Sequence, residues 1–398
     1  MTNTVTKRRR LALGGIAAAL LLAACSSTQQ GAQPAVSGSS SATTGPDCSA
    51  TSVAQQQFAQ TWNAAYTAVG MTPTVPQPDA APCQVNTSKY AKAAPAGGYR
   101  IAFASQGPTN SWAVTQEQAF TVEAAKLGVT ELYASADGDA TKQVNNLQQL
   151  TAQAPDAMVV VPMGDGIVGQ LQAAEAAGIP IVLCSGIVAN SGAVSTVTRS
   201  YNLLGTLYAD WIAKQIGSTG EVAMLSGIAG VPTAELEKVA AIREFATFPN
   251  IKVVTKQYTD WSPTKAKTIA ANMIVQYPNL KAIWSDSANT NIGVVQAYQQ
   301  AGKPVPPISG DSANAFLKSI KGSAVQFISG QFPPEMSMTC LDTAVAILKG
   351  QSVASFINVD AVTYTNAQQA TYIRPECGDN LWVPSALPDA VLKSAKLC

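Results

Sequence analysis

The sequence predicts an α/β fold in which two doubly wound parallel sheets form two lobes. From Tyr99 onward, short apolar runs typical of buried strands alternate with longer segments of helical periodicity. This rhythm is that of right-handed βαβ units, which build parallel sheets covered by helices on both faces. There are too many units for one sheet, and two facing sheets would create a cleft at the carboxyl ends of their strands, where open α/β sheets bind ligands.

The predicted strands are the apolar runs at residues 100–104, 157–161, 179–183, 221–225, 251–254 and 282–284. The predicted helices lie between them, at residues 111–127, 140–153, 167–177, 203–216, 234–247, 264–276 and 291–301. Their apolar residues recur at the spacing of one helix face.

The first 24 residues predict export. Residues 7–10 are basic, and residues 11–24 are an apolar stretch too short to span a membrane comfortably, which is the pattern of a signal peptide. The stretch ends in Leu-Ala-Ala-Cys, which resembles the bacterial lipoprotein box, so we expect the thiol of Cys25 to carry a diacylglycerol. The expected location is the outer face of the bacterial cytoplasmic membrane. An ordinary secretory signal stays an alternative, and the export route, general or twin-arginine, stays open.

Composition excludes several functions. Charged residues are 12% of the chain, about half the usual share, and no long basic run follows residue 10, so we expect no nucleic-acid partner. Histidine is absent, which removes the general base of Ser-His-Asp and Cys-His sites and the commonest transition-metal ligand. This argues against most familiar hydrolase mechanisms. We expect no catalytic residues, no metal and no cofactor.

Residues 25–47 are rich in Ser, Gly, Thr, Gln and Pro, a composition that predicts a flexible tether. Residues 48–98 then predict a small helical appendage and a linker. Apolar residues at helical spacing in 53–69 indicate one amphipathic helix, which could dock a partner or pack on the main body. We favour packing, because an apolar stripe usually faces a core.

Six cysteines remain after Cys25, and an even number outside the cytoplasm favours disulfides. The economical pairings join Cys48 with Cys83 and Cys377 with Cys398, because each pair brackets one local segment; closing the first loop would stabilise the fold by about 4 kcal/mol. The remaining two, Cys184 and Cys340, could pair or stay as buried thiols.

Six motifs at the junctions of predicted strands and helices occur in the order found in one family. They are Asn110-Ser111-Trp112 and the segments at 155–162, 177–182, 258–262, 309–312 and 330–333. Over about residues 99–365 the sequence resembles the type 1 periplasmic binding proteins, the ribose/galactose-type sugar-binding components of bacterial ABC transporters. The resemblance implies two lobes joined by three crossovers: a first lobe at 99–198 plus 332–361, and a second at 199–331 plus 362–398.

The resemblance also implies a ligand site in the cleft. Sugars need polar donors and acceptors for their hydroxyls and aromatic rings for their C–H faces. The candidate ligand-binding residues at the matching positions are Asn110, Trp112, Ser185, Trp261, Asp286, Ser287, Asp311 and Gln331. Each could instead be structural: the tryptophans as core residues, Asn110 as a turn residue and Asp311 as a helix N-cap.

The charged half of the usual sugar grip is missing. Many family members have Asp-Arg where this chain has Ser185-Gly186, and a second family arginine is not found within 231–238. The ligand could therefore be a polyol, a different sugar or a less polar ring compound. The resemblance implies a monomeric solute-binding protein that delivers its ligand to an ABC transporter permease without changing it. A receptor for a membrane sensor, or a secreted glycoside hydrolase using Asp286 and Asp311, are the alternatives.

Overall fold

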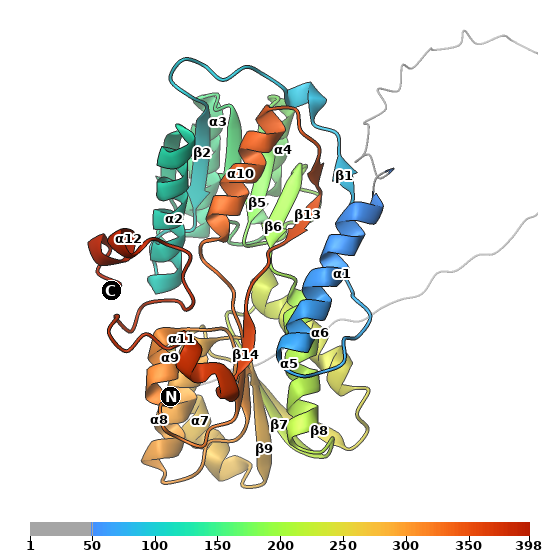
Figure 1. Cartoon of the computed structure of the whole chain (residues 1–398), viewed down its shortest axis with the longest axis vertical. Helices are drawn as coiled ribbons and strands as arrows, with labels where there is room; N and C mark the ends of the chain where they lie inside the picture. Colours follow the sequence, from blue (N-terminus) through green and yellow to red (C-terminus); the bar gives the residue numbers. More distant parts are fainter. Residues whose placement is uncertain (1–48, 50) are drawn as a thin grey trace, which may run out of the picture. The chain divides into compact units, whose positions relative to one another are not determined.

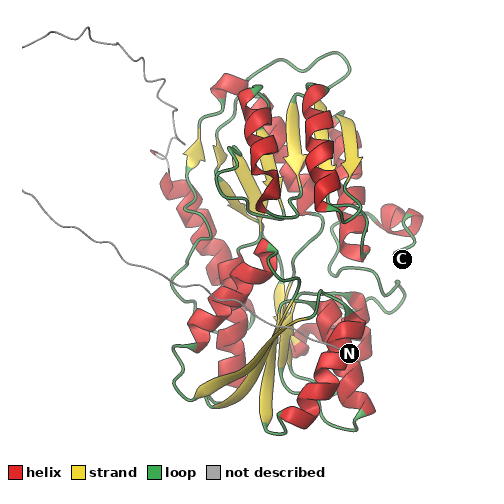
Figure 2. Ribbon diagram, turned by 180° about the vertical axis from the view of Figure 1, so that it is seen from behind, coloured by secondary structure: helices red, strands yellow, loops and turns green. Residues whose placement is uncertain are grey.

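The computed structural model describes residues 49 and 51–398, and this part of the chain forms two α/β lobes, each built on a six-stranded sheet. Helices cover both faces of each sheet (Figure 2). The predicted fold class is confirmed. The predicted signal peptide at 1–24, the predicted tether at 25–47 with Cys25, and Cys48 lie outside the described residues. Within the described part, none of the helices combines the length and the apolar character needed to cross a bilayer.

The first lobe contains a fully parallel sheet with strand order β13-β6-β5-β4-β2-β3. Its strands are β2 (Arg100–Ser105), β3 (Thr130–Ser135), β4 (Ala157–Val160), β5 (Ile181–Cys184), β6 (Ser195–Thr198) and β13 (Phe356–Asn358). Its helices are α2 (Ser111–Leu127), α3 (Ala140–Ala152), α4 (Val168–Ala176) and α10 (Met336–Leu348), and a 3-10 turn at Asp165–Ile167 precedes α4.

Alternation along the central strands divides the core of the first lobe in two. Phe103 of β2 packs on the side of α2 and α10, where it stacks on Phe120 with ring centroids 4.0 Å apart. Its neighbour Ala102 points to the opposite face, toward α3 and α4. Because both faces are buried, the central strands are apolar at every position, as a parallel sheet requires.

The second lobe repeats this plan, with strand order β14-β11-β10-β9-β7-β8. Its strands are β7 (Gly220–Ser226), β8 (Ile251–Tyr258), β9 (Leu280–Ser285), β10 (Ile308–Gly310), β11 (Phe327–Gly330) and β14 (Thr363–Thr365), of which β14 runs antiparallel to β11. Its helices are α5 (Tyr201–Gln215), α6 (Pro232–Phe245), α7 (Pro263–Gln276), α8 (Ala288–Gln300) and α9 (Asn314–Ser319).

The edge strands are where sequence patterning was least informative. Strand β3 was not predicted, and β8 extends to Tyr258, four residues beyond the predicted end. Both are edge strands whose side chains are mostly only half buried or exposed, so neither has a continuous apolar run. The short strands β6, β10, β11, β13 and β14 were also not predicted, because three or four residues carry too little periodicity.

Three crossovers connect the lobes, between β6 and α5, between β11 and α10, and between β13 and β14. The fully buried guanidinium of Arg199, in the first crossover, joins all three. It donates to the carbonyl oxygen of Gln331 in the second, and to the carbonyl oxygen of Val362 (3.2 Å) and Oγ1 of Thr363 (2.6 Å) in the third. One side chain therefore satisfies a buried backbone carbonyl group in each of the other two crossovers.

The amphipathic helix predicted within 53–69 is α1 (Thr51–Ala68), and it packs on the main body through the fully buried Trp62 and Tyr66. It contacts both lobes, since Phe58 packs edge-on against Phe356 of β13 and the hydroxyl of Tyr66 donates to Asp210 of α5 (2.7 Å). Figure 1 shows α1 running alongside β13 and α5.

The segment after α1 continues this attachment. The carboxylate of Asp79 accepts hydrogen bonds from the backbone N–H groups of Tyr201 (2.8 Å) and Asn202 (3.0 Å) at the start of α5. Downstream, β1 (Gln84–Val85) pairs with β12 (Val353–Ala354), and a 3-10 turn follows at Ser88–Tyr90. Cys83 is disulfide-bonded, but because Cys48 lies outside the described residues, the pairing of these two cysteines stays a prediction.

The C-terminal segment also contacts both lobes, whereas we predicted that 362–398 belongs to the second. A 3-10 turn at Asn366–Gln368 and helix α11 (Gln369–Tyr372) follow β14, but helix α12 (Asp389–Ser394) lies beside α2 of the first lobe (Figure 1). The indole of Trp382 donates to Oγ of Ser111 at the start of α2 (3.2 Å). The end of the chain is thus a second bridge between the lobes.

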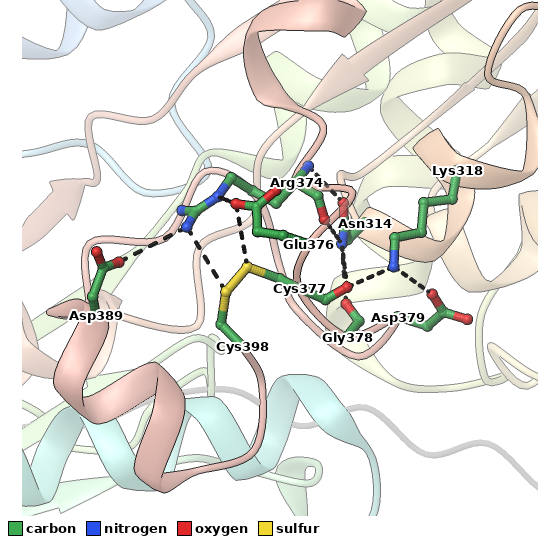
Figure 3. Close-up of a disulfide and its surroundings, with 9 residues drawn as sticks. All are labelled: Asn314, Lys318, Arg374, Glu376, Cys377, Gly378, Asp379, Asp389 and Cys398. Carbon is green, nitrogen blue, oxygen red and sulfur yellow. Dashed lines mark hydrogen bonds and ion pairs between the residues drawn. A yellow bond between two sulfur atoms is a disulfide. The ribbon is translucent and has the colours of Figure 1, made fainter.

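Two disulfides join described residues. Cys184, at the end of β5, pairs with Cys340 in α10, which resolves the open alternative in favour of a bond. Cys377 pairs with Cys398, as predicted, and so anchors the C-terminus. Beside this disulfide, Figure 3 shows Arg374 between two carboxylates, with Nε 2.5 Å from Glu376 and Nη2 3.8 Å from Asp389.

Candidate ligand-binding site

A cavity of about 340 Å³ lies between the loops that follow the strands of the two sheets. Its volume is in the range of small-molecule sites. The first lobe contributes Asn110 and Trp112 after β2, Pro162 and Met163 after β4, and Ser185 after β5. The second lobe contributes Ile228 after β7, Trp261 after β8, Asp286 and Ser287 after β9, and Asp311 after β10. This is the position that parallel-sheet topology predicts for a ligand.

Aromatic rings from both lobes and from the crossovers form the apolar walls. Trp112 lies at the start of α2, and its indole N–H donates to the carbonyl oxygen of Phe332 (2.8 Å). The Trp112 and Phe332 rings are 5.8 Å apart and tilted, and Phe332 stacks in turn on Tyr201 of α5. Trp382, from the C-terminal segment, also lines the cavity. Flat apolar surfaces of this kind pack against the C–H faces of sugar rings.

Trp261 reaches the cavity from a constrained loop. Both Asp260 and Trp261 adopt positive φ angles, of 54° and 51°, which are unfavourable for residues with side chains. The indole lies over the backbone of Gly227, where an added Cβ would be 2.0 Å from the ring. Only glycine at position 227 allows this placement, so the loops after β7 and β8 are matched to each other.

Three carboxyl groups line the second-lobe side of the cavity: Glu237 of α6 and Asp286, which are buried, and Asp311, which is half-buried. Oδ2 of Asp286 accepts a hydrogen bond from the backbone N–H of Gly227 (2.7 Å), and Oδ1 of Asp311 accepts one from the N–H of Ala288 at the start of α8. Within the described part of the chain, Oδ1 of Asp286 and Oε2 of Glu237 are buried without a hydrogen-bond partner.

Burial raises the pKa of all three carboxyl groups. Loss of solvation raises the pKa of Asp286 to about 7, although the N–H of Gly227 and the indole of Trp261 oppose the shift. Burial raises the pKa of Glu237 well above its usual range, and the neighbouring charges of Asp286 and Asp311 add to this effect. The pKa of Asp311 is raised well above its usual range, also chiefly by burial. Near neutral pH the carboxyl groups of Glu237 and Asp311 are therefore protonated, whereas that of Asp286 is about half protonated.

Some of the predicted ligand-binding residues also have structural roles. Oδ1 of Asn110 accepts from the N–H of Ala113 (3.0 Å) and so caps α2. Ser287 caps α8, and its hydroxyl accepts from the N–H of Asn289 (3.2 Å). The hydroxyl of Ser185 accepts from the side-chain amide of Gln116. Capping holds the Asn110 and Ser287 side chains at the helix N-termini that face the cavity.

Gln331 is the predicted site residue that the structure places outside the cavity lining. Its side-chain amide donates to the carbonyl oxygen of Pro384, and its side-chain oxygen accepts from the N–H of Val362 (3.3 Å). Both partners are backbone atoms, one in the third crossover and one in the C-terminal segment. The amide therefore holds the hinge together, which is the structural role that a crossover residue can take.

Among the lining residues that were not candidates in the sequence are Glu237, Phe332 and Trp382. Phe332 follows Gln331 in a motif that the sequence did single out. Glu237 lies within 231–238, where the family resemblance implies an arginine that contacts the ligand, so a charged side chain there could have been named as a candidate. No local pattern marks Trp382, because the C-terminal segment has neither the length nor the periodicity of a helix or strand there.

The described residues offer no convincing metal site. Their one cluster of metal-ligating side chains is Glu376, Cys377 and Cys398, and its two sulfurs are joined in a disulfide, so neither is a thiolate ligand.

Comparison with known proteins identifies relatives of the two-lobe region. The profile of the family described as "Periplasmic binding protein domain" matches residues 101–352. The ribose import binding protein of Bacillus subtilis is 26% identical over 281 residues, which are 69% of this chain and 91% of that protein.

Two solved structures extend the comparison to bound ligands. A periplasmic solute-binding protein of an ABC transporter from Actinobacillus succinogenes, with bound D-allose, is 26% identical, has a TM-score of 0.61, and aligns over 69% of this chain and 100% of that one. An ABC transporter solute-binding protein from Mycobacterium smegmatis, with bound glycerol, is 25% identical, has a TM-score of 0.64, and aligns over 70% of this chain and 98% of that one.

Proposed function

Because the chain belongs to the type 1 periplasmic binding proteins that serve sugar ABC transporters, we propose that it captures a sugar or polyol for an ABC importer. One observation carries this proposal for the chain itself: a cavity of about 340 Å³ that is lined from both lobes by aromatic rings, amides, hydroxyls and carboxyl groups. That mixture suits a ligand with apolar C–H faces and hydroxyl edges.

The relatives support the choice of ligand class. The Bacillus subtilis protein is a ribose import binding protein, and the two solved structures hold D-allose and glycerol. Members of this family bind solutes and do not transform them, so the proposed function is binding without catalysis. We propose that Asn110, Trp112, Ser185, Trp261, Asp286, Ser287 and Asp311 contact the ligand.

The arrangement of the lobes supports capture by closure. A ligand that touches Trp112 from one lobe and Asp286 from the other stabilises whichever arrangement brings both into contact with it. The crossovers joined by Arg199 are the segments about which such a movement would occur. A permease in the membrane can then distinguish the loaded from the empty protein by its shape.

The cellular placement completes the proposal. A lipid on Cys25 and the tether at 25–47 would hold the folded part at the outer face of the cytoplasmic membrane, next to the permease. In this form the protein acts as a monomer.

Thermal-shift screening tests the ligand class. A ligand that binds only the folded state raises the melting temperature, so we expect a concentration-dependent rise with at least one pentose, hexose or polyol. Isothermal titration then gives the affinity of each positive compound for the wild type and for the Trp112→Ala and Asp311→Asn variants. Both variants should bind more weakly, by about tenfold: Trp112→Ala loses the apolar surface that packs on the ligand, and Asp311→Asn alters a hydrogen bond that contributes about 1 kcal/mol.

The control is Glu175→Gln, an exposed carboxylate of α4 that does not line the cavity and should leave the affinity unchanged. Absence of a shift across the whole panel, together with turnover of a glycoside, would overturn the proposal in favour of a hydrolase. Unchanged affinity in the Trp112→Ala variant would show that this residue is only structural.

A further inference from the structure

The cavity has an unusual charge balance. Of the described residues that line it, three are acidic, namely Glu237, Asp286 and Asp311, and none is Lys or Arg. The chain contains no histidine. Arg199 is the cation whose charge acts on Glu237, but it does not line the cavity, and its two terminal nitrogens donate to Gln331, Val362 and Thr363 in the crossovers. The cavity therefore has no positive side chain of its own to match its carboxyl groups.

Two of these carboxyl groups have unused acceptor atoms. Asp286 is 8% exposed and Glu237 is 3% exposed, yet Oδ1 of Asp286 and Oε2 of Glu237 have no hydrogen-bond partner in the described part of the chain. A buried polar atom without a partner destabilises a fold, and a carboxylate without a countercharge does so more strongly. Both side chains line the cavity, so a small rotation of each carboxyl group would bring its unpartnered oxygen to a ligand that supplies the missing donor and charge.

An ammonium group supplies both. It offers three N–H donors and a positive charge to oxygens that can only accept when ionised, whereas a hydroxyl offers a single donor and no charge. The rings of Trp112, Phe332 and Trp261 line the same cavity, and the faces of aromatic rings also attract a cation.

We propose that the preferred ligand of the cavity is a sugar or polyol that carries a protonated amine, such as an amino sugar, with the ammonium group bound by Glu237 and Asp286. This inference rests on the proposed function and narrows its ligand class. The neutral hydroxyls of the ligand are left to Asp311, Asn110 and Ser287, and its apolar face to the rings.

Binding of such a ligand releases protons. The carboxyl groups hold protons in the empty cavity because burial raises their pKa values, and an ammonium group favours their ionised forms. After burial, the charges that act on Glu237 are those of Asp286, Asp311 and Asp79, which raise its pKa, and of Arg199, which lowers it. Tyr208 of α5 stays protonated, since burial and the charge of Glu237 raise its pKa well above its usual value. Affinity for the amine therefore increases as pH rises through the pKa values of the carboxyl groups.

The test compares matched pairs of compounds by isothermal titration at pH 7.5. Suitable sugar pairs are D-glucosamine with D-glucose and D-galactosamine with D-galactose. Suitable polyol pairs are 1-amino-1-deoxyribitol with ribitol and glucamine with sorbitol. We expect the amine member of at least one pair to bind at least tenfold more tightly than its neutral partner. Titrations in phosphate and in MOPS buffer should show proton release for that amine and none for a neutral compound.

The outcomes separate the two proposals. If neutral members bind as tightly as their amines or more tightly, the amine inference is wrong and the sugar or polyol function stands. If neither amines nor neutral compounds bind, both are overturned. Glu237→Gln should reduce the preference for the amine at least tenfold and should still unfold in one cooperative thermal transition, which shows that it is folded. The control Glu175→Gln should leave the preference unchanged. An unchanged preference in Glu237→Gln would exclude Glu237 from amine recognition and overturn the proposed binding of the ammonium group by Glu237 and Asp286.

Discussion

Replacing Asp286 by Asn should stabilise the ligand-free protein, and the gain should depend on pH. Burial raises the pKa of Asp286 from 3.8 to about 7. Between these values the folded state holds a proton on Asp286 that the unfolded state has lost. The unfolded state therefore binds fewer protons, and the contribution of Asp286 to the free energy of unfolding falls as pH rises from 4 to 7. Asn resembles the protonated acid and can still accept from the N–H of Gly227.

The magnitude follows from the shift. A change of about three pKa units at roughly 1.4 kcal/mol each amounts to about 4 kcal/mol in full. With an unfolding entropy of about 2 cal/mol/K per residue over roughly 350 residues, this corresponds to a difference in melting temperature of about 5 °C. Wild type and Asp286→Asn should melt together near pH 4, and the variant should melt about 5 °C higher at pH 8.

The assay is thermal unfolding of both proteins at half-unit steps from pH 4 to pH 8, without ligand. Glu175→Gln is the control, since its carboxylate is exposed and should leave the melting temperature unchanged at every pH. The reasoning is refuted if Asp286→Asn is no more stable than wild type at pH 8. It is also refuted if the full difference is already present at pH 4, which would show that packing and not ionisation is responsible.

Three further predictions concern the hinge and its attachments. Arg199→Lys removes the planar donor set that joins the crossovers, so it should lower the free energy of unfolding, measured in urea, by about 2–3 kcal/mol. The control Arg100→Lys, at an exposed position, should change this free energy by less than about 0.5 kcal/mol. Equal effects of the two substitutions would contradict this role for Arg199. The double change Cys184→Ala with Cys340→Ala opens a loop spanning 156 residues in sequence, so we expect a loss approaching about 5 kcal/mol on the loop-entropy model, and an unaltered melting temperature would show that the disulfide contributes nothing. Asp79→Ala leaves two backbone N–H groups at the start of α5 without their acceptor, which should cost about 1–3 kcal/mol; thermal unfolding measures it, and no loss would mean that solvent replaces the carboxylate.

The central strands and the loops after them could be predicted from sequence, and the edge strands could not. Strands such as β4 and β5 are buried on both faces, so every position is apolar and the run is visible. Strand β3 borders the sheet and alternates between half-buried and exposed positions, which leaves no such run. Trp112 and Asp286 could be named because the sequence resembles a known family at those positions, and both follow strands, whose carboxyl ends meet at one edge of a parallel sheet.

The amphipathic helix α1 shows where sequence reasoning stops. Its apolar stripe predicts that it packs on the main body, and the structure shows that it packs on both lobes at once. The C-terminal segment does the same on another side, through Trp382 and α12. Nothing in either local sequence identifies the partner surface, because that surface is assembled from strands and helices distant in the chain.

The sequence by itself determined the two-lobe α/β class, the positions of most strands and helices, and the polar and aromatic character of the loops at the cleft, because each follows from the order and periodicity of nearby residues. Only the tertiary structure decided the charge of the cavity. Glu237 reaches it from the side of a helix, Arg199 is turned away into the crossovers, and Gln331 is used by the hinge. Whether a side chain faces a ligand or another segment depends on packing between residues that may be more than a hundred positions apart.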